Sequence, residues 1–222
     1  MAAVATRWAP SILAPSSPSV SHRRRLVAAG IFDSRRPRRV SVRDAKATLL
    51  DVLARDPTGF GDPRNSDVAA VEASVEALAG VAPPWTPRSG GLGGAWNLEW
   101  TSETDVHAIV RSLPVRGIQQ DIEVRGGAQD LGQVTNRILL SLPGGIPARL
   151  EAVADVQEAS PRRLAYAFRS FAVVLGGGDG FIRLPLPVMG SGWTKATFLD
   201  ADLRVMQNSR GDTLVLTRCC EE

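Results

Sequence analysis

The sequence predicts a mainly β fold, an up-and-down antiparallel β-barrel preceded by two short α-helices. Apolar residues first recur at helical spacing in two short stretches and then alternate with polar residues from residue 95 onward. Glycine- and proline-rich turns separate the alternating segments at short intervals. A meander of this size usually closes into a barrel, because closure removes the exposed strand edges.

Residues 1–43 differ in composition from the rest of the chain. They contain nine arginines and a single acidic residue, Asp33, and they are rich in serine, alanine and proline. This composition is typical of an organelle transit peptide, so we predict a disordered segment that is cleaved after import. A basic tail that is retained and contacts anionic surfaces is the alternative.

The remaining residues carry 17 of the 26 basic side chains and 22 of the 23 acidic ones. The positive net charge of +3 therefore comes from residues 1–43, and we expect no nucleic-acid partner. No uninterrupted apolar run approaches the roughly twenty residues that span a bilayer. We therefore expect any membrane association to be peripheral.

Residues 44–91 are predicted to form a helical segment and a connector. Apolar residues at three- and four-residue spacing indicate helices over Ala45–Ala54 and Ser66–Ala79. Residues 81–91 contain too many prolines and glycines for regular structure. The apolar stripes of the helices suit packing over the barrel mouth as a lid or against its side.

Residues 92–222 are predicted to form the barrel domain. In the first strand Trp96, Leu98 and Trp100 share one face, and polar residues occupy the other. The remaining strands are expected near Val106–Ser112, Gly117–Val124, Gly132–Leu142, Ala148–Gln157, Arg163–Val174, Phe181–Leu184, Gly192–Leu199, Leu203–Gln207 and Thr213–Arg218.

The chain offers few residues for catalysis, and we predict no catalytic residue, no metal site and no cofactor. His107 is the only histidine beyond the predicted transit peptide, and its strand context suggests an ordinary surface or rim residue. Asp200 and Asp202 flank a strand corner, where we expect them to bind backbone N–H groups and to pair with Arg204 or Arg210. An enzyme with an unrecognised site remains a third class of function.

The segment from Gly192 to Arg218 carries the most specific pattern in the chain. It reads G-W-x-x-x-T-F-L-D-x-D-L-R-V, then Gly211, and ends in V-L-x-R. This pattern resembles the C-terminal signature of the plastid lipid-associated proteins, also called fibrillins or plastoglobulins. Upstream, Leu92–Ser102 is similar to the family's L-x-G-x-W-x-L-x-Y-T-S, with Trp100 in place of tyrosine. The structural motif residues of the resemblance are Gly94, Trp96, Trp193, Asp200, Asp202, Arg204, Gly211 and Arg218.

Gly94-Ala95-Trp96 together with Arg218 also resembles the lipocalin arrangement, in which a basic side chain covers the tryptophan of a G-x-W motif. First and last strands are neighbours in a closed barrel, so the resemblance places Arg218 over Trp96. The alternative is that Trp96 is a core residue and Arg218 a solvated strand end.

The resemblance implies a non-enzymatic plastid protein that binds or coats hydrophobic lipids at thylakoid or plastoglobule surfaces. The alternative is a lipocalin-type carrier of one prenyl lipid, carotenoid or fatty acid, working beside a prenyl-lipid biosynthetic enzyme. The expected lipid partners are prenyl quinones, carotenoids or fatty acids. The sequence does not identify a particular protein partner.

Each mechanism requires its own set of apolar residues. A carrier needs an open lumen, for which the expected residues are Trp96, Leu98, Trp100, Ile118 and Ile122. A coat needs an apolar loop that enters the lipid surface, for which the expected residues are Phe181, Leu184, Leu186, Val188 and Met189. An empty volume between the lumen side chains is expected for a carrier, whereas a coat protein can have a barrel filled by its own side chains.

Overall fold

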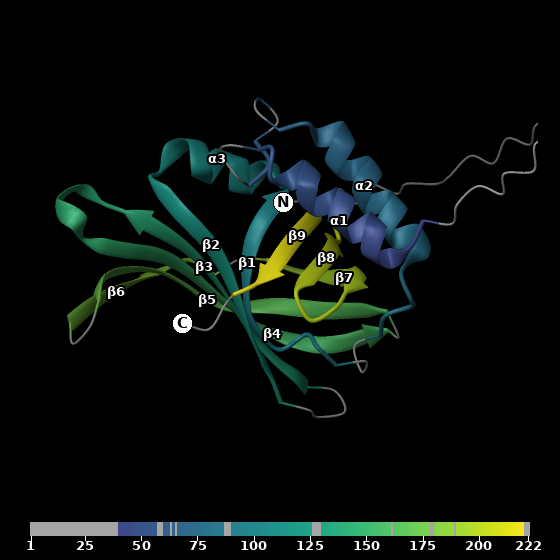
Figure 1. Ribbon diagram of the computed structural model, residues 1–222. Coiled ribbons are helices and arrows are strands. Elements are labelled where there is room, and N and C mark those ends of the chain that lie inside the picture. Colours follow the sequence, from purple (N-terminus) through teal and green to yellow (C-terminus); the bar gives the residue numbers. More distant parts are fainter. Residues whose placement is uncertain are drawn as a thin grey trace, which may run out of the picture. The chain divides into compact units, whose positions relative to one another are not determined.

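The strands of the computed structural model form one antiparallel sheet that closes on itself (Figure 1). Within the described residues eight strands complete the ring in the order β1-β2-β3-β4-β5-β7-β8-β9, and β9 pairs back onto β1. The strand bounds are β1 Gly94–Thr101, β2 Val115–Val124, β3 Asp130–Ser141, β4 Pro147–Ser160, β5 Arg163–Gly177, β6 Gly180–Leu186, β7 Ser191–Leu199, β8 Leu203–Asn208 and β9 Thr213–Arg218. The predicted fold class, a mainly β barrel preceded by two helices, is confirmed.

The structure describes residues 40–56, 60–62, 64, 66–86, 90–125, 130–160, 162–177, 180–188 and 190–219. The first 39 residues of the predicted transit peptide lie outside this part of the chain. By its internal contacts the chain separates into Met1–Arg38 and Arg39–Glu222, and all described residues belong to the second unit.

Strand β5 is paired along one edge by two different strands. Its first residues, Leu164–Ala167, pair with β7, whereas Phe171–Gly177 pair with β6. Strands β7 and β6 therefore occupy successive parts of the same edge of β5, and among the described strands β6 pairs with β5 alone. The barrel is flared at this end, and Figure 1 shows β6 projecting away from β7 and β8.

The segment between β1 and β2 is a helix, α3 (Thr104–Ser112), and the strand predicted at Val106–Ser112 is wrong. Val106 and Val110 are four residues apart, so they share one helix face and both pack against the barrel interior. An acidic residue in the first turn and a basic residue in the last turn favour the helix dipole.

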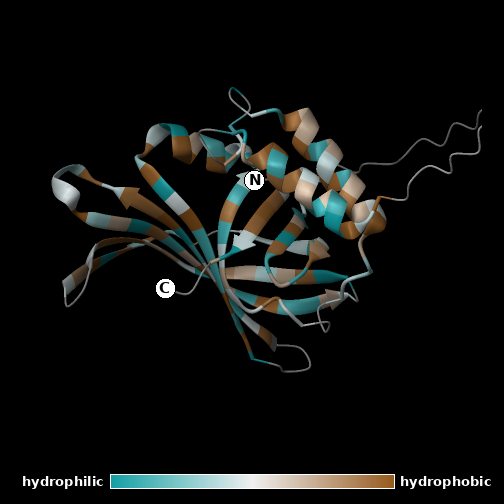
Figure 2. Cartoon of the chain, in the orientation of Figure 1, coloured by the Kyte–Doolittle hydropathy of each residue, from teal (hydrophilic) through white to brown (hydrophobic). Residues whose placement is uncertain are grey.

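Helices α1 (Val42–Leu53) and α2 (Val68–Val81) lie against the outer face of the barrel rather than over its mouth (Figure 1). The side chains of Ser41 and Asp67 cap their N-termini. The cluster that joins the helices to the barrel comprises Ala45, Leu49, Val71, Leu78, Trp100, Phe198, Leu203, Val205 and Val215. Figure 2 shows hydrophobic bands on both helices and on the strands beside them.

Strand β8 is buried on both faces because the helices cover its outer side. Leu203 and Val205 contact the helix cluster, and Met206 belongs to the cluster inside the barrel. Side chains alternate along a strand, so Arg204 shares the inner face with Met206. This arrangement places a positively charged side chain inside the barrel.

Candidate functional site

A cavity of about 530 Å³ lies inside the barrel. Every strand of the ring contributes to its lining, as does α3 through Val106. Most of the lining is aliphatic or aromatic: Leu92, Leu98, Val106, Ile118, Ile122, Val134, Ile138, Ala152, Val156, Leu164, Tyr166, Phe168, Phe171, Met206, Leu214 and Leu216. A volume of this size falls in the range of about 300–1,000 Å³ that is usual for small-molecule sites.

The residues expected in the lumen occupy three different positions. Leu98, Ile118 and Ile122 line the cavity. Trp96 belongs to the same interior cluster but is fully buried and is not part of the cavity lining. Trp100 does not line this cavity, because an irregularity in the β1–β9 register after Leu98 turns its side chain toward the helices.

Trp96 lies between two guanidinium groups. The Cζ atom of Arg218 is 4.2 Å from the centre of its ring, and that of Arg204 is 4.7 Å away. Arg218 also donates hydrogen bonds to three backbone carbonyls, those of Ala201, Gly93 and Gly91, at 2.6, 2.9 and 2.9 Å. Arg218 therefore lies over Trp96 and joins the end of β9 to the segment before β1 and to the corner between β7 and β8.

Gly94 allows Arg218 to approach this closely. Its φ is +108°, and a Cβ at this position would lie 2.5 Å from Nη1 of Arg218. A larger residue would both strain the backbone and displace the guanidinium. The glycine of the G-x-W motif thus has a steric role in this chain.

Arg204 is fully buried, and its guanidinium has few partners. Its Nη2 donates to Oε1 of Gln120, but its Nε and Nη1 have no hydrogen-bond partner among the described residues. Burial and then the positive charge of Arg218 lower the pKa of Arg204 to about 9, so the side chain remains charged at neutral pH. The prediction that Asp200 and Asp202 pair with Arg204 or Arg210 is wrong, because their cationic partner is Lys46.

The strand corner is held by Asp200. Its Oδ1 accepts hydrogen bonds from the backbone N–H groups of Asp202 and Leu203, at 2.9 and 2.7 Å. Its cationic partner is Lys46 of α1, with Nζ 2.6 Å from Oδ2. Burial raises the pKa of Asp200, but the hydrogen bonds from Lys46 and the two backbone groups outweigh it and lower the pKa below its ordinary value.

Polar residues from α3 and the β8–β9 turn gather at another part of the cavity lining. Asn208 donates to Glu103 at 2.7 Å, and Arg210 pairs with Asp105 and Asp212. Burial raises the pKa of Glu103. The turn contains Gly211, whose φ of +92° favours glycine.

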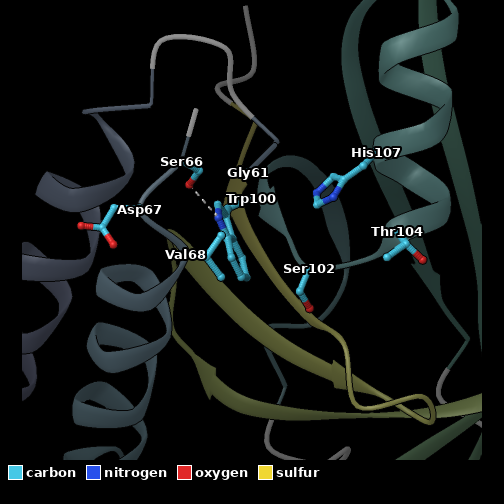
Figure 3. A pocket seen from close by; sticks show the side chains of 8 residues that line it. All are labelled: Gly61, Ser66, Asp67, Val68, Trp100, Ser102, Thr104 and His107. Carbon is cyan, nitrogen blue, oxygen red and sulfur yellow. Dashed lines mark hydrogen bonds between the residues drawn. The ribbon is translucent and has the colours of Figure 1, made fainter. Parts of the chain in front are cut away.

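His107 is buried, so the prediction of a surface or rim residue is wrong. Its Nε2 lies 2.9 Å from the carbonyl oxygen of Thr101 and 3.2 Å from that of Phe60. It borders a second pocket of about 490 Å³, which also includes Trp100 and Ser66. Figure 3 shows the hydrogen bond from the Trp100 indole to Ser66, with His107 approaching from α3 on the other side of the ring.

The residues expected in a membrane-contact loop lie mostly on strand β6. Leu186 is opposite Phe171, which lines the cavity, and cross-strand partners share one face of the sheet. By alternation Ile182 and Leu184 share that face, whereas Phe181 has the opposite one. We call Ile182, Leu184 and Leu186 the β6 lip, and the side chains of all three are exposed. Phe181 and Val188 are exposed as well. Met189 lies outside the described residues.

The remaining motif residue, Trp193 of β7, lies away from the cavity lining. The Cζ atom of Arg163 is 4.1 Å from its ring centre. In the part of the chain that the structure describes, no group of three or more His, Cys, Asp or Glu side chains is arranged to hold a metal ion. None of the described helices is long and apolar enough to cross a membrane.

Comparison with the curated proteins finds a relative that covers most of this chain. The chain is 26% identical over 182 residues to the probable plastid-lipid-associated protein 11, chloroplastic, of Arabidopsis thaliana, and the alignment covers 78% of this chain and 79% of that protein. The chain is similar to the plastid lipid-associated proteins. The relative's chloroplastic location agrees with the plastid location expected for this chain.

No family model matches the chain. No solved structure matches it either. The likeness to the plastid lipid-associated proteins therefore rests on the curated relative and on the sequence motifs, and the geometry of the barrel supports the functional argument independently.

Proposed function

We propose that this protein is a plastid lipid-associated protein that holds one apolar lipid inside its barrel. The cavity of about 530 Å³ with its largely apolar lining is the observation that carries the proposal. Burial of each lipid methylene contributes about 0.8 kcal/mol, so a flexible acyl or prenyl chain is the kind of ligand that such walls bind. Prenyl quinones, carotenoids and fatty acids are the candidate lipids.

The flared end of the barrel supplies the entry path in this proposal. The β6 lip continues the apolar face of Phe171 out of the cavity, so a lipid chain leaving a membrane or droplet stays in contact with apolar side chains. The binding role requires no chemical step, and we assign no catalytic residue. The protein would act as a carrier.

The test is to identify lipids that copurify with the full-length chain after incubation with a thylakoid lipid extract. We expect mass spectrometry of the repurified protein to show one lipid class at close to one equivalent. Ala152 lines the cavity, so Ala152→Phe fills part of it and should reduce bound lipid at least fivefold. Ala167 lies on the same sheet strand as Phe171 but is exposed and outside the lining, so Ala167→Phe is the matched control.

The carrier proposal fails if the wild-type protein retains only a trace mixture that mirrors the extract. It also fails if Ala152→Phe and Ala167→Phe retain the same amount of lipid. Circular dichroism of each variant establishes that the barrel is folded before the lipids are compared.

A second role is favoured by the exposed apolar residues of the β6 lip. We propose that this lip and the neighbouring Val188 rest on an uncharged lipid surface of thylakoid or plastoglobule type. Such surface contact is compatible with the carrier role, because the lip borders the same cavity. Adsorption to vesicles, discussed below, tests this role separately.

A further inference from the structure

The interior of the barrel contains a positive charge without a negative partner. In the described residues Arg204 forms no salt bridge, and the charge that acts on it most closely is that of Arg218, which is also positive. A buried cation is costly unless an anion or a set of hydrogen-bond acceptors compensates it. The guanidinium of Arg204 lies 4.7 Å from the centre of the Trp96 ring and has one hydrogen-bond acceptor, Gln120, while its Nε and Nη1 atoms have no hydrogen-bond partner among the described residues.

The acidic residues that share the cavity are already engaged elsewhere. Glu103 accepts from Asn208, and Asp105 pairs with Arg210 at 2.5 Å. These contacts hold both carboxylates on the side of α3 and the β8–β9 turn. Among the described residues Arg204 therefore has the Trp96 ring and Gln120 as partners but no anion, while apolar side chains form most of the same cavity lining.

Polar side chains continue from Arg204 across the cavity lining. Gln120 accepts from Arg204 through Oε1 and donates through Nε2 to Oδ1 of Asn136 at 2.6 Å. Gln120 and Asn136 are direct partners across β2 and β3, and all three residues line the cavity. The result is a polar patch, Arg204, Gln120 and Asn136, set among aliphatic and aromatic walls.

We propose that this patch binds the carboxylate of a long-chain fatty acid whose hydrocarbon tail occupies the apolar part of the cavity. The proposal rests on the carrier function and specifies its ligand class. A carboxylate neutralises the buried charge of Arg204, whereas the carbonyl of a quinone or ester accepts a hydrogen bond without neutralising it. A buried cation without an anionic partner thus favours an ionised lipid head over a neutral one.

The experiment compares two probes with the same chain and different heads, oleate and oleyl alcohol. Each is delivered from cyclodextrin to the full-length protein at pH 8, and its affinity is measured by isothermal titration calorimetry. We expect oleate to bind at least tenfold more tightly than the alcohol, because hydrogen bonds to charged groups are stronger than neutral ones. Equal affinities would overturn the assignment of a carboxylate site while leaving the carrier function intact.

Three variants locate the preference on Arg204. Arg204→Met should reduce oleate affinity at least tenfold and change the affinity for the alcohol less than threefold, whereas Arg204→Lys should retain part of the preference for oleate. Arg163 stacks on Trp193 outside the cavity, so Arg163→Met is the control for loss of one positive charge. An equal loss of both probes in Arg204→Met would show a packing role and overturn the proposal.

The outcomes separate this proposal from the carrier function. If neither probe binds the wild-type protein, the carrier function fails and the carboxylate site fails with it. If the alcohol binds and oleate binds no better, only the carboxylate site fails. Should Arg204→Met not fold by circular dichroism, the comparison of the two probes on the wild type and on Arg204→Lys decides the question.

Discussion

At the scale of single residues, charged side chains determine how this barrel is closed and tied to its surroundings. Asp62 is an example outside the cavity. Nε and Nη2 of Arg64 donate to its carboxylate, with Nη2 at 2.6 Å, and Arg111 of α3 donates to it at 3.2 Å. Asp62 therefore links α3 to the chain segment that leads into α2.

The Asp62 contacts predict an acid-sensitive stability. The hydrogen bonds from Arg64 and then from Arg111 hold the pKa of Asp62 well below its ordinary value. An unfolded chain then binds this proton at a higher pH than the folded chain, so the stabilising contribution is complete above the ordinary pKa and is lost as the pH falls below about 4. Asp62→Asn should lower the urea midpoint at pH 7, and its midpoint should fall less than that of the wild type between pH 5 and pH 3.

Circular dichroism across this pH range measures both midpoints. Parallel pH profiles for the two proteins would show that Asp62 does not contribute through its charge. Lowering the stability at pH 7 without changing the pH profile would assign the loss to hydrogen bonding alone.

The same scale shows what a sequence motif can predict. Arg218 could be placed over Trp96 because the first and last strands are neighbours in any closed barrel of this topology. The environment of Arg204 could not be predicted, because an arginine between two apolar residues of a strand normally faces solvent. Here α1 and α2 cover the outer face of β8, and alternation directs the guanidinium inward.

At the scale of elements, α1 and α2 are held to the barrel by one apolar cluster. Leu49 of α1 is fully buried in it, whereas its neighbour Leu50 is 38% exposed. Leu49→Ala should lower the free energy of unfolding by about 2–4 kcal/mol, because it removes contacts and leaves a cavity. Leu50→Ala on the same helix should cost less than about 1 kcal/mol.

Urea unfolding followed by circular dichroism measures the two losses. Equal and small losses would mean that the helices are only weakly attached to the barrel. The comparison is well matched because the two variants remove the same atoms from adjacent positions of one helix.

Sequence patterns placed most strands and both N-terminal helices, but they failed for α3. Its residues Val106 and Val110 have helical spacing, and that signal was present in the sequence. The short stretch between two predicted strands was too brief for the period to be distinguished from alternation. The packing of α1 and α2 against the side was equally consistent with a lid, since an apolar stripe does not identify its partner surface.

At the scale of the whole molecule, closure of the barrel and its flare have different origins. Closure follows from the meander of strands and was predicted. The flare arises because β7 pairs with the first residues of β5 and β6 pairs with the later ones. The position at which β6 ends and β7 begins determines how much of β5 pairs with each strand. The flare exposes the β6 lip next to the cavity and so connects the proposed carrier role to the lipid surface.

Adsorption to uncharged galactolipid vesicles tests the surface role of the β6 lip. Ile182 and Leu184 are 61% and 48% exposed, so replacing both with serine removes apolar area that would enter the lipid while changing few internal contacts. At about 25 cal/mol per Å² this loss should reduce vesicle binding of the full-length chain tenfold or more in a flotation assay.

The matched control is Val124, which is similarly exposed, at 51%, but is not part of the β6 lip. It is the last residue of β2 and pairs with Gly132 of β3. Val124→Ser should therefore bind as the wild type does. Uncharged vesicles prevent the nine arginines of residues 1–43 from dominating the result. Equal binding by both variants would place the contact with lipid elsewhere on the molecule.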